Sequence, residues 1–309
     1  MNNQLKYHII DRNQNSDYSI LSKEIVEYMY SDKNVYISHF QIRDFLKMGG
    51  IFNWINFSYI LNDVPDMPLS NETVSVCILT YNNRGYIFEF IQAIRAFASE
   101  IIVVDSGSSD GTEIIVEKIA DKVIHVQNGI GFDEKRNLGI EVSHAEWILM
   151  LDSDEALTKE AMDILRKYMT WADSNGVDIF WLPRYWVKPF CERPMYYYVG
   201  ELCLWPDPQA RLFRKKSNCK YKGRIHEKIY SKKARKAGLI LNDCCALYHF
   251  KYWFYTEDQL IEIAKERIKN QSDNMDNVQL CPWKYNKKVL AIPQRSLDTN
   301  IMDLLRRLK

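Results

Sequence analysis

The chain has 309 residues, enough for one large domain or for one domain with a smaller appendage. Its formal net charge is +1, so no overall positive field attracts nucleic acid, and a nucleic-acid partner is not expected. The seven cysteines form no C-x-x-C pair, which is typical of reduced thiols in a cytosolic protein. Because the first residues contain no apolar stretch and no run of about 18 apolar residues follows, we expect neither a signal peptide nor a membrane span.

Residues 1–70 are predicted to form a small helical appendage that ends in a linker. Residues 18–29 and 38–47 carry apolar side chains at helical spacing, and a Gly-Gly pair ends the second segment. Residues 63–71 are rich in Pro, Asp and Asn, as linkers often are. Such an appendage either helps to recognise a partner or covers the main domain, and the sequence leaves both roles open.

Residues 71–255 are predicted to form the main domain, because apolar strands alternate there with amphipathic helices. This alternation predicts an α/β fold with a mostly parallel sheet, right-handed crossovers and helices on its faces. The expected strands comprise residues 74–80, 100–105, 122–126, 147–151 and 177–187. The expected helices comprise residues 87–97, 112–119 and 132–142, and a further helix between an N-terminal cap at Thr158 and Gly176.

Residues 256–309 are expected to form a C-terminal helical segment and tail. Residues 256–271 have helical spacing with strong charge on one face, and residues 301–309 combine apolar and basic side chains. The tail either packs on the main domain or makes peripheral contact with a membrane surface. We therefore expect a cytoplasmic protein, or one held at the inner face of the membrane.

Two carboxylates follow the most apolar strand of the main domain. Asp152 and Asp154 are separated by one residue, and they come directly after residues 147–151. Open α/β sheets bind ligands at the carboxyl ends of their strands, so this is a candidate site. Because neighbouring carboxylates repel, such a pair usually needs a cation or a hydrogen-bond network.

The first two expected strands of the main domain end in other polar residues, namely Thr80-Tyr81-Asn82 and Asp105. Neither of the turns that follow contains G-x-G-x-x-G or G-x-x-x-x-G-K-[ST]. The dinucleotide fingerprint and the P-loop are therefore both absent, and a Rossmann dehydrogenase is disfavoured. A carboxylate at the end of the second strand can still accept a hydrogen bond from a nucleobase or a ribose.

Four ordered motifs carry a family resemblance, namely VSVCILTYNN, EIIVVDSGSSDGT, GFDEKRNLGI and WILMLDSDEAL. In this order they resemble the GT-A domain of family 2 glycosyltransferases. Residues 205–214 and 223–227 resemble bacterial lipopolysaccharide-core glucosyltransferases and glycocin-type peptide S-glycosyltransferases. The resemblance covers residues 73–255. It implies a GT-A fold and an inverting, metal-dependent transfer of a hexose from a nucleotide sugar, with a UDP-sugar as the first candidate.

The resemblance also implies roles for individual residues. The donor-binding set comprises Thr80, Tyr81 and Asn82 at the nucleoside, Asp105 at the base, Lys135 at the base or diphosphate, Asp152 at the ribose or metal, and Arg211 at phosphate. Arg214 shares the phosphate role, and an ordinary structural role is nearly as well supported for both arginines. Asp154, with Asp152, would hold Mg²⁺ or Mn²⁺, cations that suit oxygen ligands. His226 is the first candidate for a third metal ligand and His249 is the second.

An inverting transfer needs a carboxylate as general base on the acceptor side. Asp207 is the candidate, because it precedes the segment where the resembling family places its acceptor-side acid. Glu227 is the alternative and Glu201 a more distant one. Since Asp207 lies between two prolines, a stiff turn is the competing interpretation.

The acceptor is a saccharide, a lipid-linked saccharide or a peptide Ser, Thr or Cys, and the sequence does not decide among them. The N-terminal appendage slightly favours a peptide. The competing class is a non-catalytic GT-A protein that binds a nucleotide or a partner. The presence of Asp152, Asp154, Asp207 and His226 argues against that class.

Overall fold

The computed structural model describes residues 57–127, 130–187, 196–200, 208–223, 227–255, 259 and 287–291. The helices predicted at residues 18–29 and 38–47 lie outside the described residues. The helix predicted at residues 256–271 does so too, apart from Gln259.

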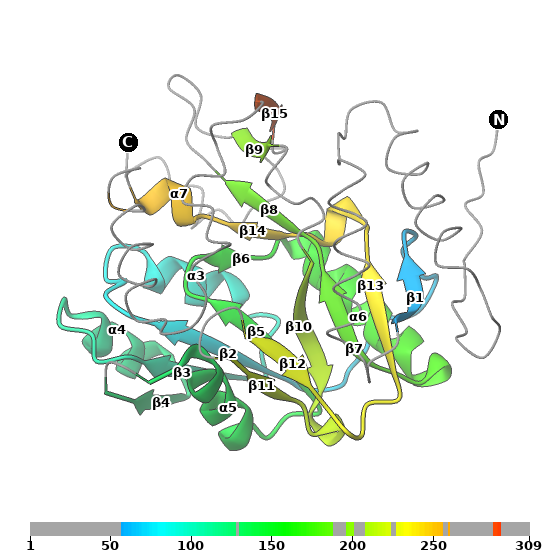
Figure 1. The fold of residues 1–309 in the computed structure, drawn as a ribbon, viewed down its shortest axis with the longest axis horizontal. Helices are drawn as coiled ribbons and strands as arrows, with labels where there is room; N and C mark the ends of the chain where they lie inside the picture. Colours follow the sequence, from blue (N-terminus) through cyan, green and yellow to red (C-terminus); the bar gives the residue numbers. More distant parts are fainter. Residues whose placement is uncertain are drawn as a thin grey trace.

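An eight-stranded sheet forms the centre of the molecule, in the order β1-β13-β7-β10-β5-β2-β3-β4 (Figure 1). Its strands are β1 (Phe57–Leu61), β2 (Val74–Thr80), β3 (Glu100–Asp105), β4 (Lys122–His125), β5 (Trp147–Asp152), β7 (Val177–Leu182), β10 (Gln209–Arg214) and β13 (Lys236–Ile240). β10 runs antiparallel to both of its neighbours, and the other described pairings of this sheet are parallel. The predicted α/β fold with a mostly parallel sheet is confirmed.

Helices cover both faces of this sheet. They are α3 (Ile87–Ile94), α4 (Thr112–Ile119), α5 (Phe132–Val142) and α6 (Lys159–Asn175). Successive residues of a strand point to opposite faces, so Val76 and Ile78 pack with α3, α4 and α6, whereas Cys77 packs with α5. α5 approaches β2 closely: a Cβ at Gly139 would lie 3.3 Å from the Cβ of Cys77.

α6 begins and ends where the sequence predicts. The Thr158 side chain accepts a hydrogen bond from the Ala161 N–H at 2.9 Å, which caps the helix. Gly176 ends it at φ 70°, a left-handed conformation that glycine adopts without strain.

A second sheet lies beside the carboxyl ends of the central strands, in the order β15-β9-β8-β14-β6. Its strands are β6 (Glu155–Ala156), β8 (Arg184–Val187), β9 (Tyr196–Gly200), β14 (Leu247–His249) and β15 (Lys287–Ala291). The prediction of a single strand over residues 177–187 is wrong, because these residues form two strands, β7 and β8, which belong to different sheets and are separated by Pro183. Proline has no N–H for a strand ladder, so a break there is favoured. The short helix α7 (Lys251–Phe254) follows β14.

A two-stranded ribbon completes the described structure. It consists of β11 (Lys220–Lys222) and β12 (Lys228–Tyr230), and it packs against α5 (Figure 1). Within the described residues no helix is long and apolar enough to cross a bilayer.

The expected boundary at residue 70 does not coincide with the edge of the central sheet. β1 pairs in parallel with β13, and the side chain of Leu61 is 1% exposed. At the other end, β15 lies in the expected C-terminal segment and pairs with β9. The alternating pattern that starts at Val74 gives no sign of β1, because the partner of β1 lies far away in the sequence.

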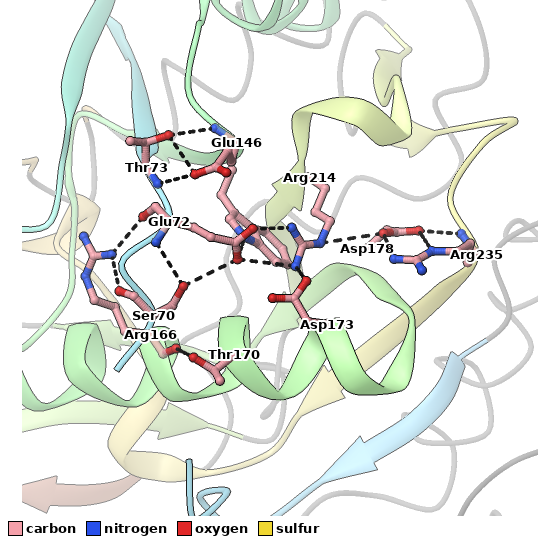
Figure 2. A network of polar contacts seen from close by, with 11 residues as sticks. Ser70, Glu72, Thr73, Glu146, Arg166, Thr170, Asp173, Asp178, Arg214 and Arg235 are labelled. Atoms are coloured by element: carbon pink, nitrogen blue, oxygen red, sulfur yellow. Dashed lines mark hydrogen bonds and ion pairs between the residues drawn. The ribbon is translucent and has the colours of Figure 1, made fainter. Parts of the chain in front are cut away.

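Polar contacts fix the predicted linker at residues 63–71 to the main domain (Figure 2). The Arg166 guanidinium donates to the carbonyl oxygens of Ser70 and Glu72 at 3.0 and 3.1 Å. The Glu72 carboxylate accepts a bond from Arg214 at 2.6 Å. The chain therefore enters β2 along a defined path.

Candidate active site

Three strands end side by side at the candidate site. β2 pairs with β3 so that Thr80 lies opposite Asp105, and with β5 so that Leu79 lies opposite Asp152. Parallel strands of this register bring their carboxyl ends to one edge of the sheet, where such folds bind ligands. The structure thus brings together the predicted donor residues of all three strands.

Asp105 is buried and accepts several hydrogen bonds. They come from the Thr80 hydroxyl at 3.1 Å, the Gly107 and Ser108 N–H groups at 3.2 and 3.0 Å, and the Ser108 hydroxyl. These bonds fix the turn after β3 beside the end of β2. A nucleobase that contacts Asp105 would therefore meet a carboxylate that cannot rotate freely.

The turn after β2 presents Tyr81 and Asn82 beside this carboxylate. Asn82 has φ 53°, its N–H donates to the Ser108 hydroxyl at 2.9 Å, and its side-chain oxygen accepts from the Ser109 N–H at 2.9 Å. Tyr81 is 47% exposed, so its ring is open to a ligand. An exposed ring beside a fixed carboxylate suits contact with a base or a sugar.

Lys135 lies in the first turn of α5, close to the same turn. Its Nζ is 5.3 Å from the centre of the Phe132 ring, and the side chain is buried. Burial lowers the pKa of Lys135 from its ordinary value, while the nearby charge of Asp105 acts in the opposite direction. The predicted donor residues Asp105 and Lys135 are therefore neighbours in space.

Asp152 is held by two arginines. Its two carboxylate oxygens accept from Arg136 at 2.6 Å and from Arg211 at 2.8 Å. Burial alone would raise the pKa of Asp152, but these two cations bring it well below the ordinary value. Arg211 also donates to Glu155 at 2.7 Å, so it links the end of β5 to β6.

Arg136 is the residue that the sequence analysis missed. Its Nε donates to Glu227 at 2.6 Å while its Nη2 donates to Asp152, and its side chain is 4% exposed. Its Nη1 is buried and has no hydrogen-bond partner among the described residues. The motif GFDEKRNLGI contains this arginine directly after Lys135, but the sequence alone gave no sign of two acidic partners.

Asp154 lies beside His249, although 95 positions separate their numbers in the chain. β6 pairs with β14 so that His249 lies opposite Glu155, and the His249 Nε2 is 3.3 Å from the Asp154 Oδ1. Burial raises the pKa of Asp154, but His249 outweighs that effect and the pKa lies below its ordinary value. The Phe250 N–H also donates to the Asp154 carbonyl at 2.8 Å.

Aromatic rings cover this turn. Tyr86, which precedes α3, stacks on Phe254 with ring centres 3.8 Å apart. Burial, and then the charge of Asp154, raises the pKa of the Tyr86 hydroxyl above its ordinary value. The segment after β14 thus packs over the turn that carries Asp154 and limits access of water to it.

Asp154 and His249 are the pair of side chains at this edge that could hold a metal ion. A carboxylate oxygen next to an imidazole nitrogen is a donor pair that suits Mn²⁺, and the carboxylate also suits Mg²⁺. Asp152, predicted as a second metal ligand, has both oxygens engaged by guanidinium groups. Among the described residues, no group of three or more His, Cys, Asp or Glu side chains could hold an ion.

Three predicted residues lie outside the described residues, namely Glu201, Asp207 and His226. Arg214, predicted to contact phosphate, lies at the opposite end of β5, where its backbone pairs with Trp147. Its guanidinium contacts Glu72 and Asp173 and lies 3.8 Å from Asp178 (Figure 2). A phosphate role for Arg214 is therefore wrong, and this arginine joins the linker to the sheet.

Residues 75–252 match the family described as Glycosyl transferase family 2. The chain belongs to this family. The family predicted from the four sequence motifs is therefore confirmed, and so is the GT-A class of its sheet and helices.

Curated relatives share part of this domain. An uncharacterized glycosyltransferase of Rickettsia bellii is 36% identical over 95 residues, which are 31% of this chain and 32% of that protein. The SPbeta prophage-derived glycosyltransferase SunS of Bacillus subtilis is 29% identical over 157 residues, 50% of this chain and 34% of SunS. The matched stretches thus span about a third of these relatives.

Solved structures with a similar arrangement include TarS of S. aureus in complex with UDP-GlcNAc, with 20% identity and a TM-score of 0.41. That match covers 65% of this chain and 68% of TarS residues 1–349. The mannosyltransferase PcManGT of Pyrobaculum calidifontis, in complex with GDP-Man and Mn²⁺, has 13% identity and a TM-score of 0.44. It covers 82% of this chain and 77% of PcManGT.

Proposed function

We propose that this protein transfers a hexose from a UDP-sugar to a saccharide or peptide acceptor, with inversion at the anomeric carbon. The observation that carries the proposal is the single edge at which Thr80, Asp105 and Asp152 end three neighbouring parallel strands. Membership of glycosyl transferase family 2 makes a nucleotide sugar the ligand to expect there.

The donor would bind with its nucleoside at Asp105 and its diphosphate toward Asp154. Asp105 offers fixed carboxylate oxygens to the base, Tyr81 offers an exposed ring, and Lys135 offers a cation close to Asp105. Arg136, whose Nη1 has no partner among the described residues, is placed between two carboxylates at the same edge. Such an unsatisfied buried donor is typical of a site that a bound group completes.

Asp154 and His249 would hold Mg²⁺ or Mn²⁺, which, when bound, neutralises the negative charge of the departing diphosphate. His226 stays a proposed further ligand. Asp152 would act in a different way: held by Arg136 and Arg211, it orients these arginines and keeps the end of β5 in place.

Asp207 remains our proposed general base, since an inverting transfer needs a carboxylate on the acceptor side. The position of Glu227 weakens it as an alternative, because its carboxylate is engaged by Arg136 at 2.6 Å. We expect Asp207→Asn to lower turnover by roughly 10²-fold, the usual scale for a lost general base, with little change in donor affinity. Near-normal turnover in Asp207→Asn together with an inactive Glu227→Gln would assign the role to Glu227.

Thermal-shift measurements with UDP-sugars and GDP-sugars, each with and without Mn²⁺, test the donor assignment. Wild type should be stabilised most by a UDP-sugar with Mn²⁺, and Asp154→Ala should lose the Mn²⁺-dependent part. Asp163→Ala is the matched control, because Asp163 is exposed on α6. If Asp154→Ala keeps the full effect of Mn²⁺, the metal assignment fails. Mass spectrometry of saccharide and peptide acceptors then tests transfer, and donor binding without hydrolysis or transfer would favour a non-catalytic protein.

A further inference from the structure

A concentration of lysines surrounds the two-stranded ribbon of β11 and β12. Six lysines from this ribbon and the turns beside it form what we call the lysine ribbon, namely Lys216, Lys220, Lys222, Lys228, Lys232 and Lys233. All are exposed except Lys228, which is partly exposed. The chain as a whole has a net charge of only +1, so this surface departs strongly from the average.

The fold places these charges on one side of the ribbon. Tyr221 and Ile229 are buried in the core beneath it, so their neighbours Lys220, Lys222 and Lys228 point outward. Lys222 lies directly opposite Lys228 in the antiparallel pair. Like charges at such positions destabilise a strand pair, although Lys222 also lies over the Tyr230 ring, with its Nζ 5.1 Å from the ring centre.

None of the six lysines forms an ion pair with a carboxylate within the part of the chain that the structure describes. Other basic residues of the same region are engaged elsewhere. Lys215 donates to the Glu141 carbonyl at 3.2 Å, Lys236 to the Tyr59 hydroxyl at 3.2 Å, and Arg235 to Asp178 at 2.8 Å. The lysine ribbon therefore has charges available for an external anion.

The lysine ribbon runs to the candidate active site. At one end, the Ser231 hydroxyl donates to the Ser217 carbonyl, which joins the turn with Lys216 to the turn with Lys232 and Lys233. At the other end, Lys228 directly follows Glu227, whose carboxylate accepts from Arg136 in the site. The Tyr221 N–H donates to the side-chain oxygen of Asn137 at 2.8 Å, which fixes the ribbon to α5.

We propose that the lysine ribbon docks an acceptor that carries repeated negative charges, such as phosphate groups along an extended saccharide chain. This inference rests on the proposed function, because it concerns the acceptor of the same site. A narrow line of lysines that ends at the site suits an extended polyanion, whose charges would follow the line toward Glu227. Lysines act as point charges that bind phosphates without demanding a fixed geometry.

An anionic membrane is the competing partner for such a surface. Membrane-binding surfaces often combine basic residues with exposed large apolar side chains, and the part of the ribbon that the structure describes has none. Within the described residues such side chains are Leu69, Tyr81, Phe88 and Ile114, and none belongs to the ribbon. The absence of such side chains from the described part of the ribbon therefore favours a soluble polyanion over a bilayer.

The test compares the triple variant Lys220→Gln, Lys222→Gln, Lys228→Gln with a control triple, Lys118→Gln, Lys159→Gln, Lys167→Gln. The control changes the net charge equally on α4 and α6, which cover the other face of the sheet. Glutamine at positions 222 and 228 also removes the repulsion across the strand pair, so the ribbon variant should stay folded.

The probe is fluorescently labelled linear polyphosphate, with binding measured by anisotropy over a range of salt concentrations. We expect the ribbon variant to lose affinity at least about 10-fold at low salt. The slope of log K against log salt should fall by about 2, since each neutralised charge on a flexible polyanion contributes about 0.7. Equal affinity in the ribbon variant and the control variant would overturn the proposal.

Vesicles of phosphatidylglycerol and phosphatidylcholine form the second arm, with binding measured by co-sedimentation. A loss of vesicle binding confined to the ribbon variant would overturn the proposal in favour of a membrane partner, whatever happens with polyphosphate. Stabilisation by UDP with Mn²⁺, measured on the same samples, should persist in both variants. If UDP with Mn²⁺ does not stabilise wild type, the proposed function fails. The polyphosphate measurement still tests the docking surface in that case, because it does not depend on donor binding.

Discussion

Glu227 accepts a hydrogen bond from the Nε of Arg136 at 2.6 Å, although 91 positions separate the two residues in the chain. Because the same guanidinium also donates to Asp152, one side chain joins the end of β5 to the start of β12. The position of the ribbon relative to the site thus depends on this arginine as well as on the packing of α5.

Arg136→Lys should weaken both the fold and the site. Lysine keeps the charge but has a single ammonium group, which cannot hold Asp152 and Glu227 in the same geometry. Breaking a buried ion pair costs about 3 kcal/mol, so we expect a loss of unfolding free energy on that scale in chemical denaturation. Arg95→Lys is the control, because the Arg95–Asp121 pair is partly exposed and this substitution should change stability by less than about 1 kcal/mol. Equal effects of the two substitutions would show that the contacts of Arg136 stabilise the fold no more than those of Arg95.

Asp105→Asn should reduce the affinity for UDP about 10-fold in calorimetric titration, since hydrogen bonds to a charged group contribute about 1.5–3 kcal/mol. Asp110→Asn provides a matched control in the same turn. Asp110 accepts from the Arg84 N–H in the turn after β2 and from the Thr112 N–H at the start of α4, so its loss should lower stability without a comparable effect on UDP. Wild-type UDP affinity in Asp105→Asn would remove this carboxylate from the donor site.

Leu61→Ala should destabilise the protein by about 2–5 kcal/mol, the usual cost of truncating a buried leucine. The reason is that Leu61 is 1% exposed in β1 and belongs to the main core. Leu69→Ala is the control, since Leu69 is 47% exposed. Denaturation midpoints of the two variants would coincide if residues 57–61 were a detachable linker.

Glu72 makes the free energy of unfolding depend on pH in the acidic range. Burial raises its pKa, but hydrogen bonds from Arg214 and Trp147 outweigh this and bring the pKa below the ordinary 4.5. A carboxylate with a lowered pKa in the folded state stabilises the fold above pH 4.5, and this contribution is lost as the pH falls through the folded pKa. Glu72→Gln should therefore be less stable than wild type at pH 7, with a smaller difference near pH 3.

Melting temperatures of wild type, Glu72→Gln and Glu160→Gln between pH 3 and 7 check this expectation. Glu160 is exposed in the first turn of α6, so its substitution should leave the pH profile close to that of wild type. If the melting temperatures of wild type and Glu72→Gln differ by the same amount at every pH, the ionisation of Glu72 does not contribute to the pH dependence of stability.

Local patterns predicted the regular elements well. α5 spans residues 132–142 as expected, and α6 lies between Thr158 and Gly176, because periodicity and caps act within a few residues of sequence. The strands β2 and β3 likewise agree with their predicted bounds. What these elements share is that their signals are contained in the segment itself.

Long-range relationships were not predictable in the same way. β10 inserts between β5 and β7, and no local signal distinguishes an antiparallel partner from a parallel one. The role of Arg136 depends on Glu227, and the neighbourhood of Asp154 and His249 depends on the pairing of β6 with β14. When the role of a residue depends on a partner far away in the sequence, the local sequence around that residue does not reveal the role.

The pairing of β1 with β13 sets an order for folding during synthesis. Residues 57–61 leave the ribosome early, but their partner at residues 236–240 is made only after most of the domain. Closing so long a loop is slow, so one edge of the nascent sheet stays open until late. A chain stalled before residue 236 should therefore expose residues 57–61 to protease, whereas a released chain should protect them.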